Sequence, residues 1–465
     1  MEQFEYETKH IMELDKSMLN KAYDFCEDYK KFMKKCKTER ECVDFFIDEA
    51  IKKGYKEYNK NTTKLESGNK YYYNNRGKAI ALFTIGSEKI DKGINFSIAH
   101  IDSPRLDLKP NPMYENSEIA FLKTHYYGGI KKYQWVTIPL SLHGVIFLSN
   151  GKELKLNIGE KESDTQFVIT DLLPHLSDEQ NKRTLKDVIK GEELNVIIGS
   201  IPFVDKDILK EKNIKNFVKH KILYLLNEQY GINEKDFLRC EIEITPALNP
   251  SDIGFDRSMV GAYAQDDRVC AYPAFIAETE CNNPSLTSMT VLTDKEEIGS
   301  EGNTGMVSNY VFDLFEDICD YYNIKARDVY KNSLCFSSDV NAAYDPTFAD
   351  VFEERNASLL NHGVTICKYT GSRGKSGAQD ASAETMNETI RILDESKVPF
   401  QVAELGKVDI GGGGTIAKFV SQRNIDTVDI GVPVLSMHSP FEITSKLDIY
   451  STYLAYKALL RREKR

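Results

Sequence analysis

The chain has 465 residues, of which 41% are hydrophobic and 28% charged, enough for about three average domains or one large domain with an insertion. Its net charge of −11 argues against nucleic acid or an anionic membrane as the main partner. No apolar run reaches the roughly 18 residues that cross a bilayer, and the acidic N-terminus lacks a signal-peptide pattern. The nine cysteines form no CxxC pair, which favours a reducing compartment and predicts a cytoplasmic protein.

The N-terminal region, residues 1–60, is predicted to be helical. Thr38 and Glu41 have capping-box spacing, and an apolar stripe of helical period follows them. Two strand-like runs, Tyr71–Tyr73 and Ala79–Thr84, flank a turn sequence and predict a hairpin. This region shows packing patterns and no chemistry.

A buried strand, Ile94–Ala99, is predicted to end at His100. The spacing His-x-Asp at a strand end places His100 and Asp102 on one face. An aspartate in that position can hold one imidazole nitrogen while the other nitrogen binds a metal ion. A histidine that only caps a loop is the alternative on local grounds.

The segment 106–245 is interpreted as an inserted β-rich domain, opened by the proline-rich boundary Lys109–Pro112. It contains short strand-like runs and a helix at Phe217–Gln229. The predicted strands are Val136–Leu142, Gly144–Leu148, Glu153–Ile158, Gln166–Thr170, Leu194–Ile201 and Phe237–Thr245. Residues 1–105 and 246–465 then form the second, discontinuous domain.

From residue 246 onward, predicted strands and helices alternate. This alternation favours an α/β fold with a mixed, largely parallel sheet covered by helices. The predicted strands are Thr287–Leu292, Ser333–Phe336, Val364–Lys368, Phe400–Leu405 and Val432–Leu435. The predicted helices are Val269–Thr279, Tyr310–Tyr322, Ser382–Asp394 and Lys446–Leu460.

Acidic residues and histidines lie just beyond several predicted strands, at the edge where α/β sheets bind ligands. They are His100, Asp266, Glu296, Glu297, Asp339 and His438. Two histidines with several carboxylates suit a pair of divalent ions, most simply Zn²⁺, with Mn²⁺ or Co²⁺ as alternatives. Because side chains alternate along a strand, Glu296 and Glu297 need not share a role. One could bind metal while the other moves protons.

The ordered motifs H-x-D, D-D-R, E-E-I-G, S-S-D and M-H-S resemble the aspartyl and vacuolar family of metallo-aminopeptidases. The run His100–Asn111 follows the family pattern H-x-D-S-P-x-L-x-x-K-P-N, and the resemblance covers nearly the whole chain. It implies a zinc-exopeptidase type of fold in residues 1–105 and 246–465, with 106–245 as a dimerisation domain. It also implies peptide substrates, two divalent ions per subunit and a homo-oligomer, a dodecamer built from dimers.

The resemblance also implies a role for each motif residue. His100 and His438 would be terminal ligands on opposite metal ions, with Asp266 as the bridging carboxylate. Glu297 and Asp339 would complete the ligand set, Glu296 would be the general base, and Asp102 would orient His100.

The substrate preference is predicted from positions at which this sequence departs from the pattern of acid-selective relatives. Acid-selective relatives carry a lysine where Cys367 stands, next to Lys368, and a histidine where Ala342 stands. Without that lysine and that histidine, an acidic side chain of the substrate would be bound more weakly. A neutral or broad preference is therefore expected. The run Gly411–Ile416 lacks phosphate-loop spacing. Its residues Gly413, Gly414 and Thr415 are predicted, with Lys368, to line the substrate cleft.

Two other classes of function remain open at this point. A related tetrahedral aminopeptidase or an amidase or deacetylase could use the same metal site. A non-catalytic peptide-binding or cage-forming scaffold could share the fold, although it would have no reason to keep the ligands and the base.

Overall fold

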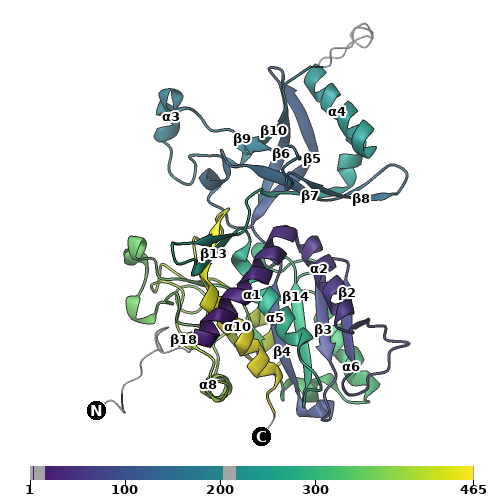
Figure 1. Ribbon diagram of the computed structural model, residues 1–465, viewed down its shortest axis with the longest axis vertical. Coiled ribbons are helices and arrows are strands. Elements are labelled where there is room, and N and C mark those ends of the chain that lie inside the picture. The colour runs from purple at the N-terminus through teal and green to yellow at the C-terminus, as the bar shows by residue number, and fades with distance from the viewer. Residues whose placement is uncertain (1–3, 5–15, 203–215, 464–465) are drawn as a thin grey trace. The chain divides into compact units, whose positions relative to one another are not determined.

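The computed structural model describes residues 4, 16–202 and 216–463, so most of the predicted helical region before residue 16 lies outside the described residues. The chain divides into two compact units (Figure 1). The first takes in the described residues up to Ser103, Pro250–Met437 and those from Phe441 onward, and the second takes in Pro104–Asn249 and His438–Pro440. The sequence had placed 438–440 in the first domain. None of the described helices is long and apolar enough to span a bilayer.

The first unit is built on a nine-stranded mixed sheet. In spatial order the strands are β1 (Lys56–Glu57), β2 (Lys70–Asn75), β3 (Ala79–Thr84), β14 (Thr287–Thr293), β4 (Ile94–His100), β15 (Leu334–Ser337), β19 (Asp426–Gly431), β17 (Val364–Cys367) and β18 (Phe400–Val402). Neighbouring strands are parallel in β1–β2, β14–β4, β4–β15, β15–β19 and β17–β18, and antiparallel in β2–β3, β3–β14 and β19–β17. The mixed α/β fold and the hairpin are as predicted, but β19 was missed.

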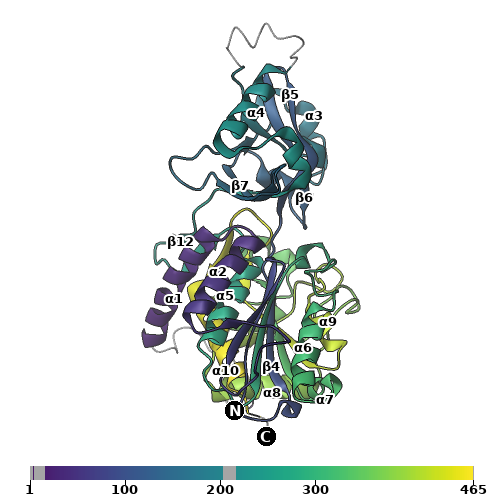
Figure 2. The same ribbon diagram turned by 90° about the vertical axis from the view of Figure 1, so that its right-hand side faces the viewer.

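Helices cover both faces of this sheet, because its central strands are buried on both sides. The helices are α1 (Lys16–Lys35), α2 (Glu39–Lys52), α5 (Gln265–Thr279), α6 (Tyr310–Tyr321), α7 (Ala326–Tyr330), α8 (Ala383–Glu395), α9 (Ala417–Ser421) and α10 (Lys446–Leu460). One buried cluster joins the strands to α6, α7 and α9, and another joins them to α5, α8 and α10. Figure 2 shows α5 and α10 on one side of β4 and α6 and α9 on the other.

A second, smaller sheet belongs to the same unit. Its order is β12 (Ser251–Ile253), β13 (Met259–Ala262), β21 (Glu442–Ser445), β20 (Pro433–Leu435) and β16 (Asn341–Ala342). Of these strands, only β20 lies in a run that the sequence predicted as a strand. The others are two to four residues long, too short for an alternating pattern to identify.

The second unit contains a seven-stranded sheet and the helices α3 (Asp178–Asn181) and α4 (Phe217–Tyr230). The strand order is β8 (Glu153–Ile158), β7 (Leu140–Phe147), β11 (Cys240–Pro246), β5 (Arg105–Asn116), β6 (Ile119–Tyr127), β10 (Asn195–Gly199) and β9 (Val168–Ile169).

Two predictions for this unit were wrong, and two of its long strands, β5 and β6, were not predicted. The proline-rich run Lys109–Pro112 is not a boundary between elements. It lies inside β5, where the pairing with β6 shifts register between Leu108 and Met113. The two runs predicted around Gly144 form one strand, β7, in which Gly144 allows close approach, since a Cβ there would lie 2.0 Å from the Glu241 carbonyl oxygen.

Candidate active site

Three adjacent parallel strands deliver the candidate residues to one edge of the large sheet. His100 ends β4 and pairs in register with Thr293 at the end of β14, after which the chain turns through Glu296 and Glu297. On the other side of β4, the Ser338 N–H following β15 donates to the Ile98 carbonyl at 2.7 Å, one residue before Asp339. Parallel strands end at the same edge, so these side chains are brought together.

His100 is fully buried, and both of its ring nitrogens face carboxylates. Its Nδ1 lies 3.3 Å from Asp102 Oδ1 and 3.1 Å from the Asp102 carbonyl oxygen. Across the ring, Nε2 lies 3.2 Å from Asp266 Oδ1 and 3.8 Å from Asp339 Oδ1. Asp266 comes from the first turn of α5, and its peptide bond to Asp267 is cis.

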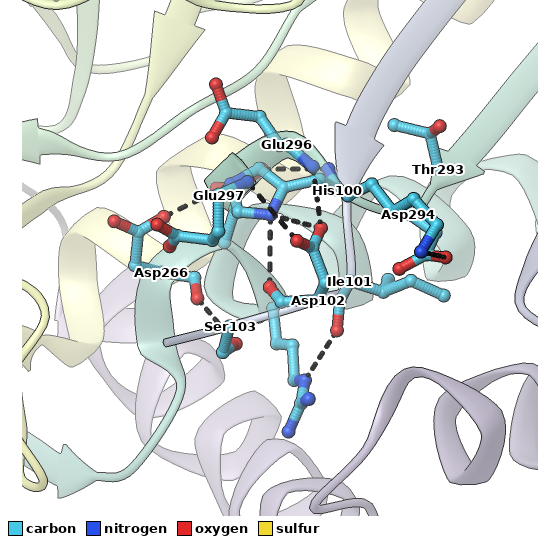
Figure 3. Close-up of polar contacts among 12 residues, drawn as sticks. His100, Ile101, Asp102, Ser103, Asp266, Thr293, Asp294, Glu296 and Glu297 are labelled. Carbon is cyan, nitrogen blue, oxygen red and sulfur yellow. Dashed lines mark hydrogen bonds and ion pairs between the residues drawn. The ribbon is translucent and has the colours of Figure 1, made fainter. Parts of the chain in front are cut away.

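Asp102 is buried between His100 and the Glu296–Glu297 turn (Figure 3). Its Oδ1 accepts the backbone N–H of Glu296 at 3.1 Å, and its Oδ2 accepts that of Glu297 at 3.2 Å. The same carboxylate thus holds the imidazole and fixes the turn that carries both glutamates, a coupling that the sequence did not predict.

The two neighbouring glutamates belong to different groups of ligand atoms. Glu297 can offer an oxygen within 4.8 Å of ligand atoms of His100 and Asp266, and Glu296 does the same with His100 and Asp339. In Figure 3 the carboxylate of Glu297 lies beside that of Asp266, whereas the Glu296 side chain points elsewhere. The two glutamates thus point apart, but they do so on a 3-10 turn after β14 and not by alternation along the strand, as the sequence had suggested.

Burial and, after it, the crowding of like charges shape the electrostatics of the cluster. Burial and the negative charge of Asp339 raise the pKa of Glu296 to about 8. Burial alone would lower the pKa of His100, but its ion-pair contacts with Asp102, Asp266 and Asp339 raise that pKa well above the usual value. Burial also raises the pKa of Asp267 well above normal. A set of carboxylates this close is most stable around positive charge.

Three supporting residues were not assigned from the sequence. Asp267 Oδ2 accepts the backbone N–H of His100 at 3.3 Å, and Glu442 Oε2 accepts that of Asp266 at 3.1 Å. The buried Arg268 donates from Nε to the Ile101 carbonyl at 3.0 Å. Asp267 and Arg268 stand inside the D-D-R motif, so the motif was the available signal. No sequence pattern pointed to the Glu442 contact.

The other predicted site residues have contacts of their own. His438 is grouped with the second unit, where its Nδ1 lies 2.8 Å from the Gly129 carbonyl oxygen. Gly413 and Gly414 are exposed, and Thr415 bonds to Asp429. Lys368 is bonded to Asp380 at 2.6 Å.

The cluster fits a metal centre on its own chemistry. His100 Nε2 is buried and makes no hydrogen bond within the described part of the chain, although carboxylate oxygens surround it. Imidazole nitrogen together with carboxylate oxygen is a donor set that Zn²⁺ and related divalent ions accept. A cation there would also relieve the repulsion among the carboxylates.

Comparison with known proteins agrees with this chemistry. The family described as aminopeptidase I zinc metalloprotease (M18) matches residues 32–460. A probable M18 family aminopeptidase 1 of Clostridium acetobutylicum is 48% identical over 453 residues, which are 96% of this chain and 96% of the relative. The crystal structure of an M18 family aminopeptidase from Thermotoga maritima has a TM-score of 0.92 at 43% identity and covers 98% of this chain and 99% of its own.

A more distant solved structure, an S. cerevisiae mApe1 dodecamer, has a TM-score of 0.75 at 19% identity, over 94% of this chain and 96% of its own, which shows the fold alone. The family resemblance expected from the motifs is confirmed by the match over nearly the whole chain. The chain therefore belongs to the aminopeptidase I zinc metalloprotease (M18) family, and it is a metallo-aminopeptidase.

Proposed function

We propose that this protein releases N-terminal amino acids from peptides at a site for two divalent ions, most simply Zn²⁺. The observation that supports this most directly is the buried cluster around His100, in which ligand atoms of Asp266 and Glu297 form one group and those of Glu296 and Asp339 form another. His100 belongs to both groups, so the proposed ligands and the proposed base Glu296 lie in one contiguous cluster, as a compact two-ion site requires.

In this proposal His100, Asp266, Glu297, Asp339 and His438 hold the ions. Bound metal ions would polarise the scissile carbonyl and acidify a water molecule. Asp102 orients His100 and fixes the glutamate turn through its two backbone contacts. His438 is included on family resemblance alone, and its Nδ1 lies 2.8 Å from the Gly129 carbonyl oxygen.

Glu296 is the proposed general base. Its carboxylate takes a proton at an oxygen of the side chain and returns it to the leaving amine. Its backbone is held by Asp102, so the carboxylate is carried on a rigid turn and not on a mobile loop. A nearby cation would lower the pKa of Glu296 from the raised value that its carboxylate neighbours impose.

A neutral or broad preference for the first residue of the peptide is proposed. Lys368, the cation nearest the position of the lysine in acid-selective relatives, is bonded to Asp380, which also binds Lys375 at 3.0 Å. Cys367 is buried, and its sulfur accepts a bond from Asn341 Nδ2. Lys368 is thus already held by a carboxylate, and Cys367 carries no ammonium group, which supports a weaker attraction for an acidic side chain.

Assembly and location are proposals as well. We infer a homo-oligomer, with the β-rich unit 104–249 as the dimerisation element and a dodecamer as the expected end state. All nine cysteines are free thiols, which supports a reducing, cytoplasmic location. The amidase, deacetylase and scaffold alternatives are not favoured, because the relatives are named as aminopeptidases.

The test is hydrolysis of a panel of aminoacyl p-nitroanilides, with free or acetylated amines. The protein is stripped with a chelator and reloaded with Zn²⁺, Mn²⁺ or Co²⁺ before each assay. We expect turnover of free-amine substrates only, activity lost on chelation and restored by metal, and faster cleavage after leucine or alanine than after aspartate. No release from any free-amine substrate by reloaded protein would refute the aminopeptidase proposal.

The base assignment needs its own variant. Glu296→Gln keeps the size of the side chain and is expected to lower kcat by about 10²–10⁴-fold while metal content stays the same. Glu301→Gln removes an exposed carboxylate from the same turn and is the matched control. Full activity in Glu296→Gln would overturn the role of Glu296.

A further inference from the structure

The glycine-rich loop 411–414 lies against the backbone of another loop and has no side chains with which to hold its place. Gly412 has φ of 116°, and a Cβ there would lie 2.0 Å from the Gly371 carbonyl oxygen. The Gly413 carbonyl accepts the Gly371 N–H at 2.6 Å. The first residue after the glycines that can make a side-chain contact is Thr415.

Thr415 is bonded to a carboxylate inside the large sheet. Its Oγ1 donates to Asp429 Oδ1 at 2.7 Å, and Asp429 is only 3% exposed. Asp429 lies on β19 between Val428 and Ile430, which pack into the apolar cluster with α5, α8 and α10. Because side chains alternate along a strand, Asp429 points to the opposite face. A carboxyl buried in an apolar strand is costly unless it is hydrogen-bonded, which is what Thr415 supplies.

The same strand touches the loop that carries Asp339. Asp429 pairs in register with Ser337, the last residue of β15. Two residues further along β19, a Cβ on Gly431 would lie 1.7 Å from the Asp339 carbonyl oxygen. The backbone next to Asp339 and the side chain that holds Thr415 are therefore fixed by one short stretch of β19.

We propose that Asp429 is a positioning residue that, through Thr415, holds the glycine loop at a fixed place relative to Asp339. The inference rests on the proposed function and on the sequence-based prediction that Gly413, Gly414 and Thr415 line the substrate cleft. Asp429 is neither a proposed ligand nor the proposed base. Its effect would reach the substrate through the backbone of Gly413 and Gly414, which carry no side chains of their own.

The test compares variants that remove or keep one hydroxyl. Thr415→Val keeps the shape and loses the donor, so KM for the best p-nitroanilide substrate is expected to rise about ten-fold to a hundred-fold with kcat nearly unchanged. Thr415→Ser keeps the donor and is expected to recover most of the lost affinity. Ser421→Ala removes a hydroxyl bonded to the Lys418 carbonyl on the adjacent α9 and serves as the matched control.

Amide hydrogen exchange of residues 411–414 gives a second readout that does not need activity. Exchange is expected to be faster in Thr415→Val and close to the wild type in Thr415→Ser. In the background of Asp429→Leu, Thr415→Val should add no further rise in KM, because both changes break one contact.

The outcomes separate two kinds of failure. Unchanged KM or unchanged exchange in Thr415→Val overturns the positioning role and leaves the aminopeptidase proposal standing. A fall in kcat and in global stability with no rescue by Thr415→Ser also overturns it, since the contact is then merely structural. If wild-type protein cleaves no free-amine substrate, the proposed function fails, and the substrate part of this inference fails with it.

Discussion

Glu278 on α5 should make the stability of the first unit depend on pH in the neutral range. Its side chain is completely buried, and hydroxyl groups surround it. Oε1 accepts from Thr84 at 2.9 Å, Ser288 at 2.9 Å and Tyr55 at 3.2 Å, and Oε2 accepts from Thr290 at 3.3 Å. Burial raises the pKa of Glu278 to about 7, although these hydroxyls act in the opposite direction.

The direction of the pH effect follows from this raised pKa. The folded state holds a proton on Glu278 that the unfolded state releases above its ordinary pKa of about 4.5. The stabilisation from this group is therefore complete below pH 4.5 and is lost as the pH rises through about 7. Between pH 5 and pH 8 the loss amounts to about 2 to 3 kcal/mol in the free energy of unfolding.

Glu278→Gln should remove that loss, because an amide does not ionise and the hydroxyls can act as donors or acceptors. Urea denaturation of wild type and variant at pH 5 and pH 8 measures it. The variant should gain about 2 to 3 kcal/mol relative to the wild type between the two pH values. Other buried carboxyls, such as Asp448, titrate in both proteins and cancel in the difference.

Glu57→Gln removes the same charge from the exposed strand β1 and is the control. The reasoning is refuted if the stability difference between wild type and Glu278→Gln is the same at both pH values, or if Glu57→Gln reproduces the effect.

Two further changes test how the site is built. Asp102→Asn replaces an acceptor with a donor beside the N–H groups of the glutamate turn. Metal affinity should therefore fall about 10–100-fold in a competition with a chelating dye. Unchanged affinity would contradict the role of Asp102 in holding His100 and this turn. Gly431→Ala forces a Cβ onto the Asp339 carbonyl and should lower the free energy of unfolding by about 1–3 kcal/mol or more in thermal denaturation. Gly374→Ala is the control and should have little effect, because no atom lies within 4 Å of a Cβ at that position.

Sequence reasoning found the site residues that end long apolar strands. His100 and the glutamates follow β4 and β14, each seven residues long and wholly buried, so their pattern is plain. The four-residue β15, which precedes Asp339, is also entirely apolar or small. Asp266 was placed by its D-D-R motif, because the strand before it, β13, is short and contains Gly261.

Contacts that depend on tertiary packing could not be predicted. The bond from the Asp266 N–H to Glu442 joins residues 176 positions apart, and the two N–H groups that Asp102 holds lie about as far from it along the chain. No local pattern encodes such pairs. The assignment of 438–440 to the second unit likewise follows from which backbone His438 contacts and not from its place in the sequence.

Strand β19 was not predicted, because it contains two residues that are unusual in a buried strand. Its sequence, Asp426–Gly431, has only two apolar residues, because Asp429 and Gly431 stand on the face where a strand buried on both sides would carry further apolar side chains. A strand at the centre of a sheet has no structural need for a buried carboxyl or a glycine, and both weaken it. Each of them instead meets a neighbour on the site side of the fold: Asp429 holds Thr415, and Gly431 admits the backbone of Asp339. Asp429 and Gly431 therefore made the strand hard to predict, and the needs of the strand alone do not explain their presence. A functional constraint is expected at such positions.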